Sequence, residues 1–233
     1  MFAPSLHLLS AGAAKGLVLA LQPEFESSGG LRLASTFGAV GAMREKLDGG
    51  APCDAILLTR SMLDDLAAAG RVDAHSVRYV GWVHTGVAVP QGAAAAAVTD
   101  ATALRALLQS AGAIYLPDPE RATAGIHALK VLRELGQAQP ERLRPHANGA
   151  AAMAAMAREG GVTSVGITQV SEILYTPGVQ LLGALPPPFA LATLYSAATV
   201  QGAAQRDAAT RLLALLGAPA QAGLRQRSGF EPH

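Results

Sequence analysis

The stretch LHLLSAGAAKG, residues 6–16, passes from an apolar run through a turn of small residues into an amphipathic segment. A short apolar run that leads into a longer run of helix-forming residues indicates a buried strand followed by a helix. The same alternation continues along most of the chain and predicts an α/β fold, with parallel strands joined by crossover helices. Strands are expected at residues 6–9, 31–37, 55–58, 82–89, 113–116, 164–168, 179–182 and 190–199, and helices at residues 13–25, 41–47, 61–69, 100–110, 124–135, 150–158, 170–174 and 203–215.

Two breaks, at residues 90–92 and 186–188, lie beside the long β-rich stretches 82–89 and 190–199. Proline and glycine interrupt regular structure, so these breaks are candidate boundaries between parts of the chain. Two long β-rich stretches far apart in the sequence predict two crossings between lobes. We expect one lobe to comprise residues 1–81 plus 196–233 and the other residues 82–195, with a ligand cleft between them.

The composition excludes several classes of function. The chain has 233 residues, 50% of them hydrophobic, and a formal net charge of +1. This balance gives no electrostatic footprint for nucleic acid or for an anionic membrane surface. The single cysteine, Cys53, cannot form an intramolecular disulfide or a thiolate metal cluster, and the histidines have no metal-ligand spacing. Phosphate-loop and dinucleotide motifs are also missing from the sequence. We therefore expect no nucleic-acid partner from the balanced charge, no metal from the cysteine and histidine pattern, and no cofactor from the missing motifs.

The first residues carry no basic segment, and the apolar run at residues 6–9 ends at Ser10, Gly12 and Lys15. This pattern predicts no secretory signal. No stretch reaches the ~18 to 20 apolar residues of a membrane-spanning helix, so no membrane insertion is expected. We expect a soluble protein, cytoplasmic if Met1 is the native start and periplasmic if a signal peptide was removed ahead of it.

Four segments, in this order and spacing, resemble the periplasmic molybdate-binding proteins of ABC importers. They are LLSAGAAKG at residues 8–16, FGAVGAMR at 37–44 with GAPCD at 50–54, DPERATAGI at 118–126, and VGITQ at 165–169. The resemblance implies the type 2 periplasmic-binding-protein fold, in which two Rossmann-like lobes joined by two crossing strands close over a ligand. Each segment is a small-residue turn that opens a helix, where unpaired backbone amides and the helix dipole favour an anion.

The chain departs from this family at the residues that would bind the oxyanion. The family supplies serine hydroxyls from the first two turns, and the matching positions here are Ala13 and Val40. Each missing hydrogen bond in a dry site costs about 1 to 3 kcal/mol, so we discount molybdate and tungstate as ligands. The resemblance places the family's tyrosine ligand at Tyr195. The residues of the family's third turn are retained here as Ala124 and Gly125.

The other ligand-binding candidates lie at the same turns and supply backbone amides, neutral polar groups or positive charge. Arginine suits a planar carboxylate better than a compact tetrahedral anion, and an apolar wall suits the carbon atoms of a ligand. The sequence therefore favours a small organic acid with two or three carboxylates. These candidates are Ser10, Gly12, Gly41, Arg60, Arg121, Thr123, Thr168 and Gln169.

Other residues have simpler structural interpretations. Arg44 is spaced to pair with Asp48 on one helix face. Asp54 is expected to support the approach to the strand at residues 55–58, and Cys53 to be a small buried residue. Glu172 is expected to cap a helix or to face solvent. Residues 148–149, Asn-Gly, have the composition of a helix N-cap.

Three functions remain. The preferred one is a solute-binding protein that captures the organic anion, with an ABC permease as its partner. The alternative is an isomerase that moves a proton on an unsaturated carboxylic acid such as aconitate, on the same scaffold. The last is a cytoplasmic ligand sensor. We rank it below the other two, because we expect no DNA-binding or signalling segment in this sequence. Candidates for proton transfer in the isomerase are His127, Tyr195, His84 and Lys15.

Overall fold

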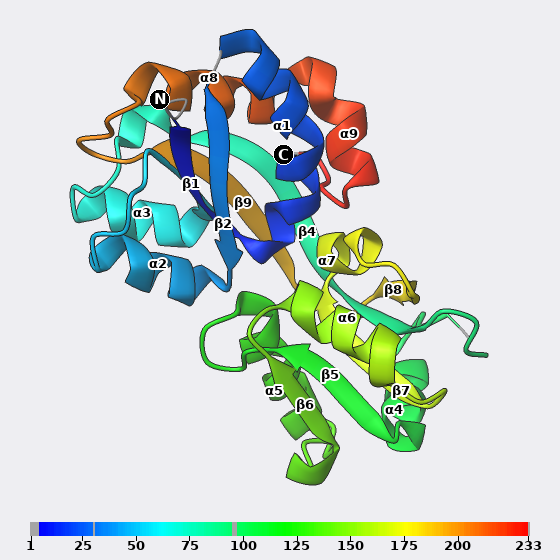
Figure 1. The fold of residues 1–233 in the computed structure, drawn as a ribbon. Helices are drawn as coiled ribbons and strands as arrows, with labels where there is room; N and C mark the ends of the chain where they lie inside the picture. The colour runs from blue at the N-terminus through cyan, green and yellow to red at the C-terminus, as the bar shows by residue number, and fades with distance from the viewer. Residues whose placement is uncertain (1–4, 30, 95–96, 233) are drawn as a thin grey trace. The chain divides into compact units, whose positions relative to one another are not determined.

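The computed structural model describes residues 5–29, 31–94 and 97–232. The chain forms two compact units, unit 1 from Met1–Trp82 and Leu194–His233, and unit 2 from Val83–Thr193 (Figure 1). It passes from one unit to the other twice, within β4 (Arg78–Pro90) and within β9 (Ala192–Thr199). From the sequence, these junctions are expected after Gly81 and after Tyr195.

Unit 1 is built around a sheet with the strand order β2-β1-β3-β9. β1 pairs in parallel with β2 and β3, and β9 runs antiparallel to β3. α1 packs on β2 and α8, α2 on β1, and α3 on β3. Every residue of β3 is buried, as expected for a central strand covered on both faces. The elements are β1 (Ser5–Ala11), η1 (Gly12–Ala14), α1 (Lys15–Gly29), β2 (Arg32–Gly38), α2 (Val40–Asp48), β3 (Ala55–Thr59), α3 (Arg60–Ala68), η2 (Ala74–Ser76), α8 (Arg206–Gly217), η4 (Pro219–Gln221) and α9 (Ala222–Arg227).

Unit 2 contains a second sheet with the strand order β8-β4-β7-β5-β6. β5 pairs in parallel with β6 and β7, whereas β4 runs antiparallel to β7 and β8. α6 packs on β5 and β7, as Figure 1 shows, and α5 also packs on these two strands. The elements are α4 (Ala101–Ser110), β5 (Ala113–Pro117), α5 (Thr123–Glu134), η3 (Pro140–Arg142), β6 (Leu143–His146), α6 (Gly149–Glu159), β7 (Ser164–Gln169), α7 (Val170–Tyr175) and β8 (Val179–Ala184).

Alternating residues of the unit 2 strands face two different cores. In β5, Ile114 and Leu116 join the core formed with α4 and α5, whereas Tyr115 packs with Met153 and Met156 of α6. Gly166 of β7 leaves room for the methionine side chains of α6, because a Cβ there would lie 2.4 Å from the Cε of Met153. Helices therefore cover both faces of the unit 2 sheet, as in a doubly wound α/β fold.

Each of the eight expected strands has a counterpart, but β6 was not expected. Its sequence, residues 143–146, contains one apolar residue and a proline. β6 pairs only with β5 in the sheet order, and proline is tolerated at such an edge position. No helix within the described ranges is long and apolar enough to cross a membrane.

Candidate functional site

In unit 1, three strand-to-helix turns contain five of the thirteen residues expected to bind a ligand. β1 leads into η1 with Gly12 and Ala13, β2 leads into α2 with Val40 and Gly41, and β3 leads into α3 at Arg60. These parallel strands end at the same edge of the sheet, which is where ligands gather in open α/β sheets. The N-cap positions of η1 and α2 are alanines, so neither helix has a side chain that caps its first amides.

Ala13 and Val40 place buried apolar side chains at two of these turns. These side chains are 5% and 7% exposed, and neither can donate a hydrogen bond. The nearby Ser10 is fully buried, and its hydroxyl donates to the carbonyl of Ala11 at 3.0 Å. The hydroxyl proton of Ser10 is therefore already used within the protein.

Arg60 and Arg44 each pair with an aspartate four residues further along the same helix. In Arg60, Nε donates to Asp64 at 2.8 Å and Nη1 donates to the hydroxyl of Tyr79 at 2.9 Å. The hydrogen bond to Asp64 is the main reason that the pKa of Arg60 is raised, so it remains a cation. Arg44 pairs with Asp48 at 2.6 Å, as its spacing predicts. Lys15 begins α1 and is half-buried.

Tyr195 lies in β9 opposite Thr59 of β3. Its side chain is 2% exposed, and its ring meets that of Phe230 edge-on, with 6.1 Å between the ring centroids. Tyr195 thus contributes to the packing of unit 1. Its role as a ligand or as a proton-transfer group stays a prediction.

In unit 2, a tightly organised turn connects β5 to α5. The Asp118 carboxylate accepts hydrogen bonds from the backbone amides of Glu120 and Arg121, at 2.8 and 3.0 Å. A Cβ at Gly125 would lie 2.2 Å from the carbonyl oxygen of Asp118, so this close approach requires glycine. Residues Thr123, Ala124 and Gly125 form the first turn of α5, and its N-cap residue, Ala122, has no capping side chain.

His127 anchors α5 to a loop of unit 2. Its Nε2 lies 2.8 Å from the carbonyl oxygen of Phe189, which can only accept, so Nε2 carries the proton. The other ring nitrogen, Nδ1, is then the one that could take up a proton. The second histidine candidate, His84, lies half-buried in β4.

Glu172, expected to cap a helix or to face solvent, is a buried residue of unit 2. Its carboxylate is 5% exposed and accepts a 2.6 Å hydrogen bond from the hydroxyl of Thr168. It also accepts from the backbone amides of Gly149, Ala150 and Gln169. Burial raises the pKa of Glu172, although these hydrogen bonds oppose that change. The expectation of a capping role is correct and that of a solvent-facing one is wrong, because Glu172 covers the amino end of α6.

This arrangement also uses the hydroxyl proton of Thr168, one of the expected ligand donors. The neighbouring Gln169 ends β7, is 2% exposed and lies opposite Thr85 of β4. Its Nε2 donates to the hydroxyl of Thr193 at 3.5 Å. Gln169 is therefore a neutral polar group at the carboxyl end of the unit 2 sheet.

Asn148 caps α6 as expected, because its side chain accepts from the amide of Ala151 at 2.9 Å.

Asp54 has the structural role that the sequence predicts. Its two carboxylate oxygens accept from the backbone amides of His7 and Gln205, both at 2.9 Å, which ties β1 to the segment before α8. In the part of the chain that the structure describes, no group of three or more His, Cys, Asp and Glu side chains could hold a metal ion.

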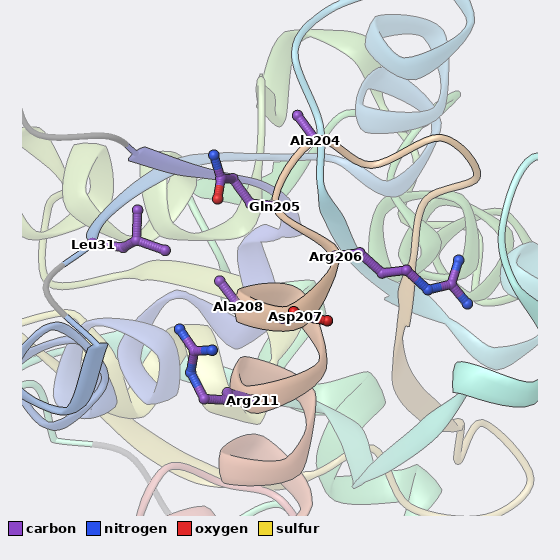
Figure 2. A pocket seen from close by; sticks show the side chains of 7 residues that line it. All are labelled: Leu31, Ala204, Gln205, Arg206, Asp207, Ala208 and Arg211. Atoms are coloured by element: carbon purple, nitrogen blue, oxygen red, sulfur yellow. The ribbon is translucent and has the colours of Figure 1, made fainter.

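A surface hollow of about 250 Å³ lies in unit 1 at the amino end of α8 (Figure 2). It contains side chains of both charges and none of the residues expected to bind a ligand. Its lining residues are Leu31, Ala204, Gln205, Arg206, Asp207, Ala208 and Arg211.

Cys53 provides a first test of the structure. Burial raises the pKa of its thiol to about 12, and the thiol donates to the carbonyl of Ala55 at 3.1 Å. Thiolate is the reactive form, so we expect a disulfide reagent at pH 8 to label the native protein at least about 10³-fold more slowly than the unfolded protein. The measurement is the labelling rate with and without denaturant. The sequence predicts a buried residue, but Cys53 is only half-buried, and equal rates would contradict the raised pKa of its thiol.

Comparison with known proteins places this geometry in context. A family model described as bacterial extracellular solute-binding protein matches residues 6–231. A curated relative, the aconitate isomerase of a Pseudomonas species, is 27% identical over 98% of this chain and 88% of its own length.

Two solved structures show the same fold. The periplasmic molybdate-binding protein of Azotobacter vinelandii superposes with a TM-score of 0.79 at 16% identity, covering 98% of this chain and 100% of that one. The sulfate-binding protein SubI of Mycobacterium tuberculosis superposes with a TM-score of 0.77 at 19% identity, covering 98% and 87%. These likenesses confirm the periplasmic-binding-protein fold that the sequence predicted.

Proposed function

This chain belongs to the bacterial extracellular solute-binding protein family, and we propose that its solute is a small organic acid with two or three carboxylates. The observation that carries this proposal is the lack of side-chain donors at two unit 1 turns. Ala13 and Val40 are buried and apolar there, and Ser10 donates to the protein's own backbone. A tetrahedral oxyanion needs several donors around its oxygens, whereas carbon atoms of an organic acid pack well against apolar side chains.

The first turn of α5 supplies the complementary polar group for a carboxylate. Thr123 and Ala124 begin a helix of twelve residues whose N-cap is an alanine, so its first amides are not capped by a side chain. Such an end favours negative charge without any cationic residue. In this role, the partner expected to receive the solute is an ABC permease.

The proposal is tested by measuring the melting temperature with different anions. We expect dicarboxylates or tricarboxylates to raise the melting temperature by several degrees, because a ligand that binds only the folded state stabilises it. Molybdate and sulfate are expected to leave it unchanged. As a matched variant, the double substitution Ala13→Ser and Val40→Ser restores both hydroxyls and should create measurable molybdate binding. Stabilisation of the unaltered protein by molybdate, with no response to organic acids, would show that the proposal is wrong.

A second candidate function is an isomerase acting on an unsaturated acid, and its support is the aconitate isomerase relative that matches 98% of this chain. In such a reaction, a base removes a proton from one carbon of the acid, the double bond shifts, and a proton is returned to another carbon. His127 could accept the proton at Nδ1, because its Nε2 is committed to Phe189. One proton leaves the acid and one returns, and no net oxidation or reduction occurs, so the isomerisation needs no cofactor.

Proton NMR of aconitate incubated with the protein in D₂O separates the two functions. Isomerisation or deuterium incorporation would support the enzyme, and its absence despite binding would support the solute-binding role. The variant His127→Gln keeps an N–H donor for Phe189 but removes the basic ring nitrogen Nδ1, so it should abolish the reaction and leave the fold intact. The exposed His75 provides the control, since His75→Gln should have no effect.

A further inference from the structure

Three side-chain oxygens among the described residues of unit 2 are buried without a hydrogen-bond partner, that of Ser171 and two that lie on residues paired across neighbouring strands. The latter two are Oε1 of Gln169 and Oγ1 of Thr85. The two residues face each other in the antiparallel pairing of β7 with β4, and their exposed fractions are 2% and 1%. A buried polar atom without a partner is costly, so a pair of them on adjacent strands is expected where a bound group completes the hydrogen bonds.

The two side chains that carry these atoms are neutral, and so is the polar side chain that Gln169 contacts. The Nε2 of Gln169 donates to the hydroxyl of Thr193, the second residue of β9. The backbone amide of Thr85 donates to the carbonyl of Leu191, and the backbone amide of Leu185 donates to the carbonyl of Thr85. The backbone bonds of Thr85 are thus satisfied within unit 2, which leaves the two side-chain oxygens as the unmet groups.

The chemistry of the two atoms selects the group that would fit. An amide oxygen only accepts, whereas a threonine hydroxyl both donates and accepts. A carboxylate would place lone pairs against Oε1 of Gln169, and an ammonium group, which only donates, would leave the hydroxyl proton of Thr85 without an acceptor. A hydroxyl can donate to Gln169 and accept from Thr85 at the same time. Alcohol groups therefore match this pair of residues better than either charged group.

We propose that Gln169 and Thr85 recognise a hydroxyl group on the solute, so that the preferred ligand is a hydroxycarboxylic acid. This inference rests on the proposed function, because it assigns the uncharged part of the same organic acid. The position agrees with it, since Gln169 ends β7 at the carboxyl edge of the sheet.

Paired acids that differ by one hydroxyl test the inference directly. We expect malate to bind more tightly than succinate, and citrate more tightly than tricarballylate, by roughly tenfold to hundredfold in isothermal titration calorimetry. Equal affinities within both pairs, or tighter binding of the acids without a hydroxyl, would overturn the inference while leaving the proposed function intact. If no organic acid binds, the proposed function fails and this inference fails with it.

Substitutions locate the effect. Thr85→Val is nearly isosteric and removes the hydroxyl, and Gln169→Met removes the amide at similar length. Each should reduce the preference for malate over succinate to about twofold or less. Thr199 supplies a matched control, because its Oγ1 is also buried without a partner but lies in unit 1. Thr199→Val should keep the full preference, and loss of the preference in this control would contradict the assignment.

Discussion

Replacing Glu172 with leucine is expected to lower the free energy of unfolding by at least about 3 kcal/mol. The carboxylate accepts from the hydroxyl of Thr168 and from the backbone amides of Gly149, Ala150 and Gln169. Leucine offers no acceptor, so these buried donors would lose their partner. Urea unfolding at neutral pH, followed by circular dichroism, measures the change.

Glu172→Gln is the matched control, because glutamine keeps one acceptor oxygen in a side chain of the same length. Its cost should be well below that of leucine. A leucine variant as stable as the unaltered protein would show that the carboxylate is not the buried acceptor at the amino end of α6.

The pH dependence of this pair provides a second measurement. Burial raises the folded-state pKa of Glu172 above its ordinary value of 4.5, so the folded protein binds this proton more tightly than the unfolded chain does. The resulting stabilisation is present below pH 4.5 and is lost as the pH rises through the folded-state pKa. Relative to Glu172→Gln, the unaltered protein should therefore lose stability as the pH rises above 4.5. The opposite slope would mean that the hydrogen bonds outweigh burial.

The fold was predictable because its signals are local. An apolar run followed by small residues and a helix-forming segment recurs in both units, and β1, β3, β5 and β7 all follow this pattern. β6 was missed because its pairing with β5 depends on the neighbouring strand and not on its own polar sequence. Local patterning therefore predicts central strands better than edge strands.

The candidate site was harder to predict, because sequence position does not show which polar groups are already paired. Ser10 and Thr168 were expected to donate to a ligand, but their hydroxyls donate to Ala11 and Glu172. Arg60 likewise contacts Asp64 and Tyr79, and Tyr79 lies nineteen positions further along the chain. Contacts between residues this far apart in sequence arise only when the strands and helices pack.

One signal for Glu172 was present in the sequence. Gly149 follows the capping residue Asn148 at the start of α6, and a Cβ at Gly149 would lie 1.9 Å from Oε2 of Glu172. Because Gly149 has no side chain, the carboxylate of Glu172, which lies in α7, fits against this helix end. A glycine directly after a capping residue therefore indicated that another group lies close to this helix end, although it did not identify that group.

Replacing Gly125 with alanine is expected to disrupt the candidate site most strongly. The new Cβ would lie 2.2 Å from the carbonyl oxygen of Asp118 and 2.5 Å from that of Pro117. Both are backbone atoms, so the first turn of α5 must move away from the end of β5. We expect a loss of about 1 to 3 kcal/mol in stability from this overpacking. Under the proposed function, affinity for the organic acid should also fall at least about tenfold, because the amides of Thr123 and Ala124 are displaced.

Gly161 supplies the matched control in the same unit, because no atom lies within 4 Å of a Cβ built there. Gly161→Ala should therefore leave both stability and affinity unchanged. Urea unfolding and isothermal titration calorimetry on the two variants separate the structural effect from the functional one. If Gly125→Ala were destabilised but bound the acid as tightly as the unaltered protein, the first turn of α5 would not be part of the ligand site. If it were fully stable, the tight connection between β5 and α5 would itself be wrong.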